Sequence, residues 1–138
     1  MASAIDMRLT AVDGSKHNLQ QYQGKWLIVN YWATWCPPCL AEMVELQAFH
    51  NDRHDQDAMV LGINAELISR EKLATFLDDY FITYPNFVSR PGRPSKLGQV
   101  PGLPTTFVVS PEGEVVARQV GPVTREMIEN FIVKSTVE

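Results

Sequence analysis

The chain has 138 residues, of which 45% are apolar and 20% are charged, and its formal net charge is -4. This length suits one domain, residues 1–138, with a hydrophobic core of its own. The negative charge argues against nucleic acid as a partner. The sequence contains no run of about 18 apolar residues, so it predicts no membrane-spanning helix. It also contains no secretory signal pattern.

The beginning of the chain predicts a β-hairpin. A strand at residues 7–12 and a short stretch at residues 17–19 flank an Asp-Gly-Ser turn signal at residues 13–15. Residues 26–32 then form an apolar run that only Asn30 interrupts. Such a run is typical of a central strand that is buried on both faces.

Two helices and a second strand are predicted next. The first helix runs from the region of Cys39 to about His54, with an apolar face formed by Leu40, Met43, Val44, Leu46 and Phe49. Residues 58–64 predict a second buried strand, and Ser69 is a candidate N-cap of the second helix. The apolar positions of that helix are Leu73, Phe76, Leu77 and Tyr80. Alternating strands and helices predict an α/β sheet with covered faces.

The last third of the chain predicts a loop, a second hairpin and a helix. Residues 83–104 are rich in proline and glycine and predict mainly loop, with a short strand at residues 86–89. Strands at residues 105–109 and 114–120 flank a Ser-Pro-Glu-Gly turn and predict an antiparallel hairpin. Thr124 then caps a terminal helix. Its expected staple and buried stripe comprise Val123, Met127, Ile128, Phe131 and Ile132.

The only two cysteines, Cys36 and Cys39, stand two residues apart at the predicted start of the first helix. A pair with this spacing can cycle between a dithiol and a disulfide. The helix N-terminus stabilises a thiolate and lowers the pKa of Cys36 below its ordinary value of about 8.5. We therefore predict an exposed nucleophile at Cys36 and a more buried resolving thiol at Cys39. Pro37 and Pro38 fit the first helical turn.

Residues 30–39 (NYWATWCPPC), with Glu42 three positions later and residues 102–107 (GLPTTF) far downstream, resemble the TlpA/ResA-like branch of the thioredoxin superfamily. The resemblance covers residues 5–135. It implies a thioredoxin-like α/β fold, with a central mixed β-sheet flanked by helices and an N-terminal β-hairpin extension. It also implies a thiol–disulfide oxidoreductase that acts on proteins as a reductant, for instance in cytochrome c maturation.

The same resemblance implies the cellular setting. The protein would need no metal or organic cofactor, and a membrane or thioredoxin-type electron donor would regenerate its dithiol. It would be a monomer in the periplasm or another extracytoplasmic compartment, where some members are tethered to a membrane; a cytoplasmic location is the alternative. On this view, residues 1–3 replace a removed signal or anchor.

The resemblance also assigns roles to residues outside the cysteine pair. It places a cis peptide bond before Pro104, and Pro101 is the competing proline. The backbone of Leu103 would pair with an extended substrate segment. The residues expected to contact substrate are Trp35, Pro37, Pro38, Leu103 and Pro104. Trp26 and Trp32 are expected in the core.

Glu42 is the expected proton acceptor for Cys39. The two residues share one face of the helix, and a partly buried carboxylate there would have a raised pKa. Asn30 stands where ordinary thioredoxins carry an aspartate, and an amide takes up no proton, which strengthens the case for Glu42. Glu66, at the end of the second strand, is the alternative acceptor. The competing interpretation of Glu42 is a solvated first-turn glutamate.

Other chemistries fit the sequence less well. Cys36, Cys39, His50 and His54 approach a zinc-finger spacing, but one helix would place His50 roughly 16 Å beyond Cys39. We therefore expect solvated histidines, His17 included. A peroxidase would need a Thr-x-x-Cys setting, and Thr34 lies two residues before Cys36.

Three further alternatives stay open. The first is a disulfide-donating oxidant of the same fold, the second is an isomerase of that fold, and the third is a non-catalytic chaperone or adaptor. An intact cysteine pair argues against the last.

Arg90, Arg93 and Lys96 form a basic patch that would favour acidic partners, although a solvated loop is the favoured interpretation.

Overall fold

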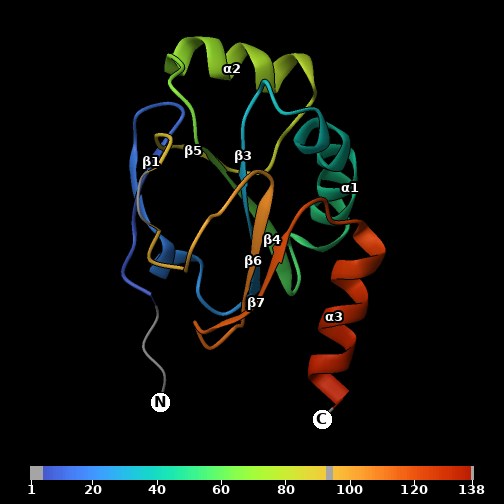
Figure 1. The fold of residues 1–138 in the computed structure, drawn as a ribbon. Helices are drawn as coiled ribbons and strands as arrows, with labels where there is room; N and C mark the ends of the chain where they lie inside the picture. The colour runs from blue at the N-terminus through green and yellow to red at the C-terminus, as the bar shows by residue number, and fades with distance from the viewer. Residues whose placement is uncertain (1–4, 93–94, 138) are drawn as a thin grey trace.

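The computed structural model describes residues 5–92 and 95–137, and these form a mixed sheet with three α-helices (Figure 1). Residues 1–3, the expected replacement for a signal, and Arg93 lie outside this range. The elements are β1 (Arg8–Ala11), β2 (Lys16–Asn18), a 3-10 helix η1 (Leu19–Tyr22), β3 (Trp26–Trp32), α1 (Pro37–Arg53), β4 (Ala58–Asn64), α2 (Arg70–Asp79), β5 (Asn86–Val88), β6 (Thr105–Val109), β7 (Val115–Val120) and α3 (Arg125–Val137).

The sheet has the strand order β2-β1-β5-β4-β3-β6-β7. β3 runs parallel to β4 and antiparallel to β6, and β4 runs parallel to β5. β1 pairs with β2 and also with β5, so the predicted N-terminal hairpin extends the main sheet. This mixed sheet, flanked by helices, confirms the predicted fold class.

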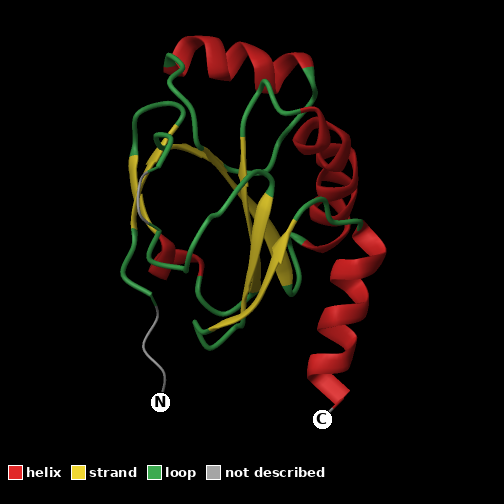
Figure 2. Ribbon diagram, in the orientation of Figure 1, coloured by secondary structure: helices red, strands yellow, loops and turns green. Residues whose placement is uncertain are grey.

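β3 lies inside the sheet, between β4 and β6, and all seven of its residues are buried. Ile28 packs in a core with Phe49 of α1 and with residues of α3. Val29, on the opposite face, packs in a second core with residues of β1, η1 and the loop before β6. Figures 1 and 2 show α1 and α3 on one side of the sheet and α2 at its upper end, whereas the short η1 lies on the other side. The continuous apolar run therefore gives a strand buried on both faces, as predicted.

The predicted helix caps are confirmed. The Ser69 hydroxyl accepts a hydrogen bond from the Lys72 N–H at 3.2 Å, and the Thr124 hydroxyl accepts one from the Met127 N–H at the same distance. The polar residues therefore satisfy backbone donors that have no partner inside the helix. No helix in the described residues is both long and apolar enough to cross a membrane.

Some predicted helix positions were wrong. Val44 is 72% exposed and Met127 is 43% exposed, although both were expected on buried stripes. The buried stripe of α1 comprises Cys39, Glu42, Met43, Leu46, Phe49 and His50. These positions recur every three or four residues, and Val44 falls outside that spacing. Hydrophobic character alone does not tell which apolar residues a helix turns inward.

His50 was expected in solvent, but it is buried at 5% exposure. Its Nδ1 accepts a hydrogen bond from the Val60 N–H at 3.1 Å, which satisfies the ring within the core. Burial lowers the pKa of His50 to about 4, and the nearby charges of His54 and Lys25 act in the same direction. His50 is therefore a neutral core residue that joins α1 to β4.

The difference between Phe49 and Val44 gives a stability test. Phe49→Ala removes a fully buried ring between α1 and the sheet, and we expect it to lower the free energy of unfolding by about 3–5 kcal/mol. Val44→Ala, the matched control on the same helix, should change it by no more than about 0.5 kcal/mol. Urea unfolding followed by circular dichroism measures both. Equal losses would contradict this packing of α1.

Candidate active site around Cys36 and Cys39

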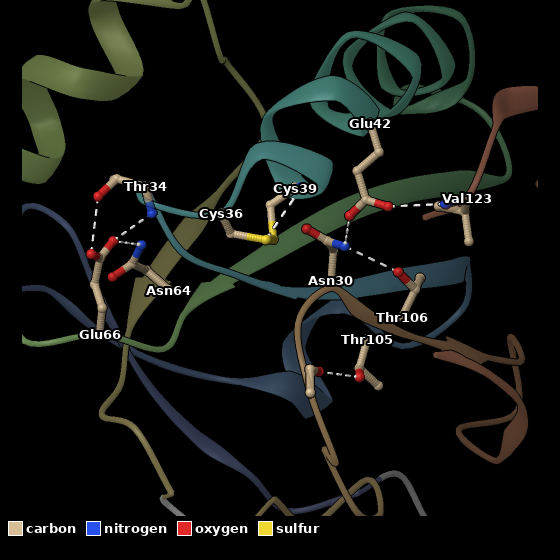
Figure 3. Close-up of a disulfide and its surroundings, with 11 residues drawn as sticks. Asn30, Thr34, Cys36, Cys39, Glu42, Asn64, Glu66, Thr105, Thr106 and Val123 are labelled. Atoms are coloured by element: carbon tan, nitrogen blue, oxygen red, sulfur yellow. Dashed lines mark hydrogen bonds between the residues drawn. A yellow bond between two sulfur atoms is a disulfide. The ribbon is translucent and has the colours of Figure 1, made fainter. Parts of the chain in front are cut away.

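The cysteine pair stands at the N-terminus of α1, just beyond the end of β3. Cys36 is the N-cap residue, and Pro37 and Pro38 occupy the first helical positions, as predicted. Cys36 and Cys39 form a disulfide, and the Cys36 Sγ accepts a hydrogen bond from the Cys39 N–H at 3.4 Å (Figure 3). The same N–H would stabilise a thiolate at Cys36 once the disulfide is reduced.

The predicted exposure of the motif is only partly right. Cys39 is fully buried, as expected, but Cys36 is also buried at 3% exposure. The disulfide joins its sulfur to that of the buried Cys39 across the first turn of α1. Trp35, at 67% exposure, and the two prolines form the surface around the sulfur atoms. Trp26 and Trp32 are buried in the core, as predicted.

The loop before β6 carries the predicted cis peptide bond. This bond joins Leu103 to Pro104, and not Val100 to Pro101. The Gly121 N–H donates to the Pro104 carbonyl at 2.9 Å, and the Thr105 hydroxyl donates to the Gly102 carbonyl at 2.6 Å. In the described part of the chain, the N–H and C=O of Leu103 have no hydrogen-bond partner. These two backbone groups can therefore pair with another extended segment.

A groove of about 800 Å³ lies between the cysteine motif and this loop. Trp35 lines it on the motif side, and Leu103 and the neighbouring loop residues line it on the other. Arg90 contributes to its wall, whereas the Lys96 ammonium donates to the Asp6 carbonyl. Arg90 and Lys96 therefore have separate surroundings, and Arg93 lies outside the described residues, so the basic patch stays a prediction.

Glu42 lies one helical turn after Cys39 and is 2% exposed. Its Oε1 accepts a hydrogen bond from the Asn30 Nδ2, and its Oε2 accepts one from the Val123 N–H at 3.0 Å (Figure 3). Burial raises the pKa of Glu42 to about 7, although both hydrogen bonds act in the opposite direction. The solvated interpretation is therefore wrong, and the expected burial and raised pKa are confirmed. The sequence held no signal for Val123, because its contribution is a backbone N–H.

Glu66 has different surroundings. Its Oε1 accepts hydrogen bonds from the Thr34 N–H at 2.7 Å and from the Asn64 Nδ2 at 2.8 Å. Its Oε2 accepts one from the Thr34 hydroxyl at 2.9 Å. The carboxylate thus fixes the loop that leads from β3 to Cys36. Sequence reasoning missed Thr34 and Asn64 as its partners, because nothing in the local pattern connects them.

The structure does not assemble the zinc spacing seen in the sequence. His50 uses its Nδ1 for the Val60 N–H, and its ring stacks on that of His54 with centroids 4.7 Å apart. Across residues 5–92 and 95–137, no three His, Cys, Asp or Glu side chains come together as a metal-binding group. Because the two cysteines cap one end of α1 and the histidines lie near the other, they do not share a site.

Comparison with known proteins agrees with this geometry. The model of the AhpC/TSA family matches residues 2–118. The thiol-disulfide oxidoreductase ResA of Geobacillus kaustophilus is 32% identical over 133 residues, which cover 95% of this chain and 75% of that protein.

Two solved structures share the fold. A DsbF homologue from Corynebacterium diphtheriae superimposes with a TM-score of 0.82 at 29% identity, over 96% of this chain and 86% of that one. A secreted thiol-disulfide isomerase from Corynebacterium glutamicum gives a TM-score of 0.79 at 26% identity, over 93% and 81%. With its helix-capping cysteine pair, this chain belongs to the AhpC/TSA family and is a thiol–disulfide oxidoreductase of the ResA type with a thioredoxin-like fold.

Proposed function

We propose that this enzyme reduces disulfides in protein substrates with the Cys36–Cys39 dithiol. The observation that carries the proposal is the position of Cys36 as the N-cap of α1, with Cys39 buried behind it. In the reduced enzyme, the Cys36 thiolate attacks a substrate disulfide, and one substrate sulfur leaves as a thiolate. Cys39 then attacks the Cys36 sulfur, the second substrate thiolate leaves, and two electrons have passed to the substrate.

Substrate binding in this proposal uses the surface between the motif and the cis-proline loop. The unpaired backbone N–H and C=O of Leu103, next to Pro104, would form hydrogen bonds with an extended segment of the substrate, as neighbouring strands do in a sheet. Trp35, Pro37 and Pro38 are exposed beside the disulfide and would contact the residues around the substrate cysteine. The adjoining groove offers room for a side chain of that segment.

Glu42 is the proposed proton acceptor for Cys39. It lies on the same helix face one turn away, and a pKa of about 7 lets it take up a proton near neutral pH. Glu66 is a weaker candidate, because its two oxygens accept three hydrogen bonds, from the Thr34 N–H, the Thr34 hydroxyl and the Asn64 amide, whereas the oxygens of Glu42 accept two. We assign Glu66 the task of holding that loop.

The setting is proposed by analogy with the relatives. One structural neighbour is a secreted thiol-disulfide isomerase, which supports a periplasmic or other extracytoplasmic location, with or without a membrane anchor. The disulfide formed in each cycle needs a reductant, and we propose a membrane or thioredoxin-type electron donor. We further propose that residues 1–138 act as a single domain and as a monomer, without a metal or organic cofactor.

The cysteine variants test the exchange reaction. Cys36→Ser should abolish reduction of a disulfide-bonded test protein such as insulin. Cys39→Ser should keep the nucleophile and accumulate a mixed disulfide with the substrate, because the second step is lost. Mass spectrometry detects that adduct, and circular dichroism controls for folding. If a variant lacking both cysteines kept its biological activity, the chaperone or adaptor alternative would replace this proposal.

The reduction potential tests the direction of electron flow. We expect a value near about -270 mV, as in thioredoxin, measured by equilibration with dithiothreitol. A value near about -120 mV would instead indicate a disulfide-donating oxidant, and one near about -180 mV would indicate an isomerase. Turnover of hydrogen peroxide tests the peroxidase alternative. The Thr34 hydroxyl donates a hydrogen bond to Glu66, and this does not favour that alternative.

The variant Glu42→Gln tests the proton acceptor. In the wild-type enzyme, the step performed by Cys39 should accelerate as the pH rises through about 7, because Glu42 then becomes able to accept a proton. In Glu42→Gln this inflection should disappear, and the rate at pH 8 should fall by about 100-fold. Stopped-flow tryptophan fluorescence during oxidation measures it. An unchanged inflection would point to another acceptor.

The pH dependence of folding stability gives a second test of the raised pKa of Glu42, with the same variant. The pKa of Glu42 is higher in the folded protein, about 7, than its ordinary 4.5, so the folded state binds the proton more tightly. The free energy of unfolding should therefore fall, by up to about 3 kcal/mol, as the pH rises through this interval. Glu42→Gln removes the titrating group, so its stability should depend less on pH. Parallel profiles for both proteins would show that the pKa is not raised.

A further inference from the structure

Asn30 is fully buried on β3, directly beneath the first turns of α1. Its Nδ2 donates to the Glu42 Oε1 and to the Thr106 Oγ1, the latter at 3.0 Å. Its Oδ1 is also buried and has no hydrogen-bond partner in the described structure. An unpaired buried carbonyl oxygen is costly and uncommon, so this atom needs an explanation.

While Glu42 is ionised, its carboxylate sets the orientation of the Asn30 amide. A reversed amide would place the Oδ1 against the Glu42 carboxylate, which is an acceptor when ionised. In the observed orientation the Nδ2 faces Glu42 and Thr106, and Figure 3 shows the Oδ1 on the side of the Cys36–Cys39 disulfide. The unpartnered oxygen is therefore turned toward the redox centre.

A disulfide has no hydrogen to donate, so the oxidised protein offers this oxygen nothing from the sulfur side. Reduction changes that situation, because it places a thiol S–H on Cys39. Cys39 is fully buried, and its S–H is a weak donor that also needs a partner inside the protein. In the reduced state, the Cys39 thiol would then need an acceptor on the side toward which the Asn30 Oδ1 points.

We propose that Asn30 is a positioning residue whose Oδ1 accepts a hydrogen bond from the Cys39 thiol in the reduced enzyme. This inference rests on the proposed function, in which Cys39 is the resolving thiol. The hydrogen bond favours the neutral thiol over the thiolate. Cys39 is thereby kept protonated while Cys36, at the helix N-terminus, is the thiolate.

The other end of the same amide serves the next step. The Asn30 Nδ2 holds the Glu42 Oε1 beside the redox centre. When Cys39 attacks the mixed disulfide, its proton passes to the Glu42 carboxylate, its sulfur forms the bond to Cys36, and the substrate thiolate leaves. Asn30 neither gains nor loses a proton. An asparagine can fill both roles because, unlike a carboxylate, it does not compete with Glu42 for the proton.

Infrared spectroscopy of the S–H stretching band tests the hydrogen bond. In a Cys36→Ser background, Cys39 is the only thiol of the chain. A hydrogen-bonded S–H absorbs at lower frequency than a free one, so adding Asn30→Leu should shift the band upward. Thr106→Val is the matched control, because it removes the other partner of the Asn30 amide and leaves the Oδ1 in place. A band that stays fixed in Asn30→Leu, or that moves equally in Thr106→Val, would overturn the proposal.

A second measurement uses the unaltered protein and therefore does not depend on the folding of a variant. With asparagine labelled by ¹³C at its side-chain carbonyl, the reduced-minus-oxidised difference spectrum reports asparagine carbonyls that change partners. We expect one carbonyl band to move to lower frequency on reduction, because the Oδ1 gains a donor. If the thiol donates to Glu42 instead, the asparagine bands stay fixed and the inference is wrong.

The same experiments separate this inference from the proposed function. Mixed-disulfide trapping by Cys39→Ser reports exchange without involving Asn30. If exchange occurs and neither infrared band moves, only the role of Asn30 is lost. If the bands move but no mixed disulfide forms with a protein substrate, the hydrogen bond stands as a structural feature and the proposed reaction falls, together with the role in catalysis given to Asn30.

Discussion

The buried carboxylate of Glu42 is the constraint on which the arrangement around the cysteines depends. A carboxylate in a core is costly unless its oxygens are hydrogen-bonded. Here β3 supplies the amide of Asn30, and the segment before α3 supplies the N–H of Val123. These contacts bind α1, the central strand and the C-terminal segment to one side chain, so the part of α1 that carries Cys39 is held against the sheet.

The two hydrogen bonds and the burial act on the pKa of Glu42 in opposite directions, and burial has the larger effect. An exposed glutamate would stay ionised at neutral pH and would be a poor proton acceptor. A buried glutamate that accepted no hydrogen bonds would be neutral at this pH, and the Asn30 amide and the Val123 N–H would then have no acceptor. The observed environment lies between these limits, and its cost in stability above pH 7 accompanies the proton transfer that we propose for Glu42.

Much of the fold could be predicted from the sequence because its signals are local. The continuous apolar run of β3, the caps at Ser69 and Thr124 and the start of α1 at the cysteine motif each depend on a few adjacent residues. The cis bond before Pro104 was predicted from a family resemblance, not from local physics. Sequence reasoning failed at Val44 and Met127, where an apolar side chain is exposed to solvent.

In the site, too, local sequence signals could be predicted and tertiary contacts could not. Glu42 was predicted because it stands one turn from Cys39, but its partner Val123 is 81 residues away and contributes only a backbone N–H. No sequence pattern marks such a donor. The contact between Glu66 and Thr34 spans 32 residues and likewise depends on how β3 and β4 end side by side. Tertiary structure, and not residue type, decides what each carboxylate does.

Two glutamates near one redox centre thus have different tasks because their surroundings differ. Glu66 is half-buried and accepts three hydrogen bonds from donors at the ends of β3 and β4, so it holds the approach to Cys36 in one conformation. Glu42 is more deeply buried, accepts two hydrogen bonds and has a pKa near neutrality. A carboxylate that accepts three hydrogen bonds is a good structural anchor. These surroundings support the proposal that Glu42, and not Glu66, accepts the proton of Cys39.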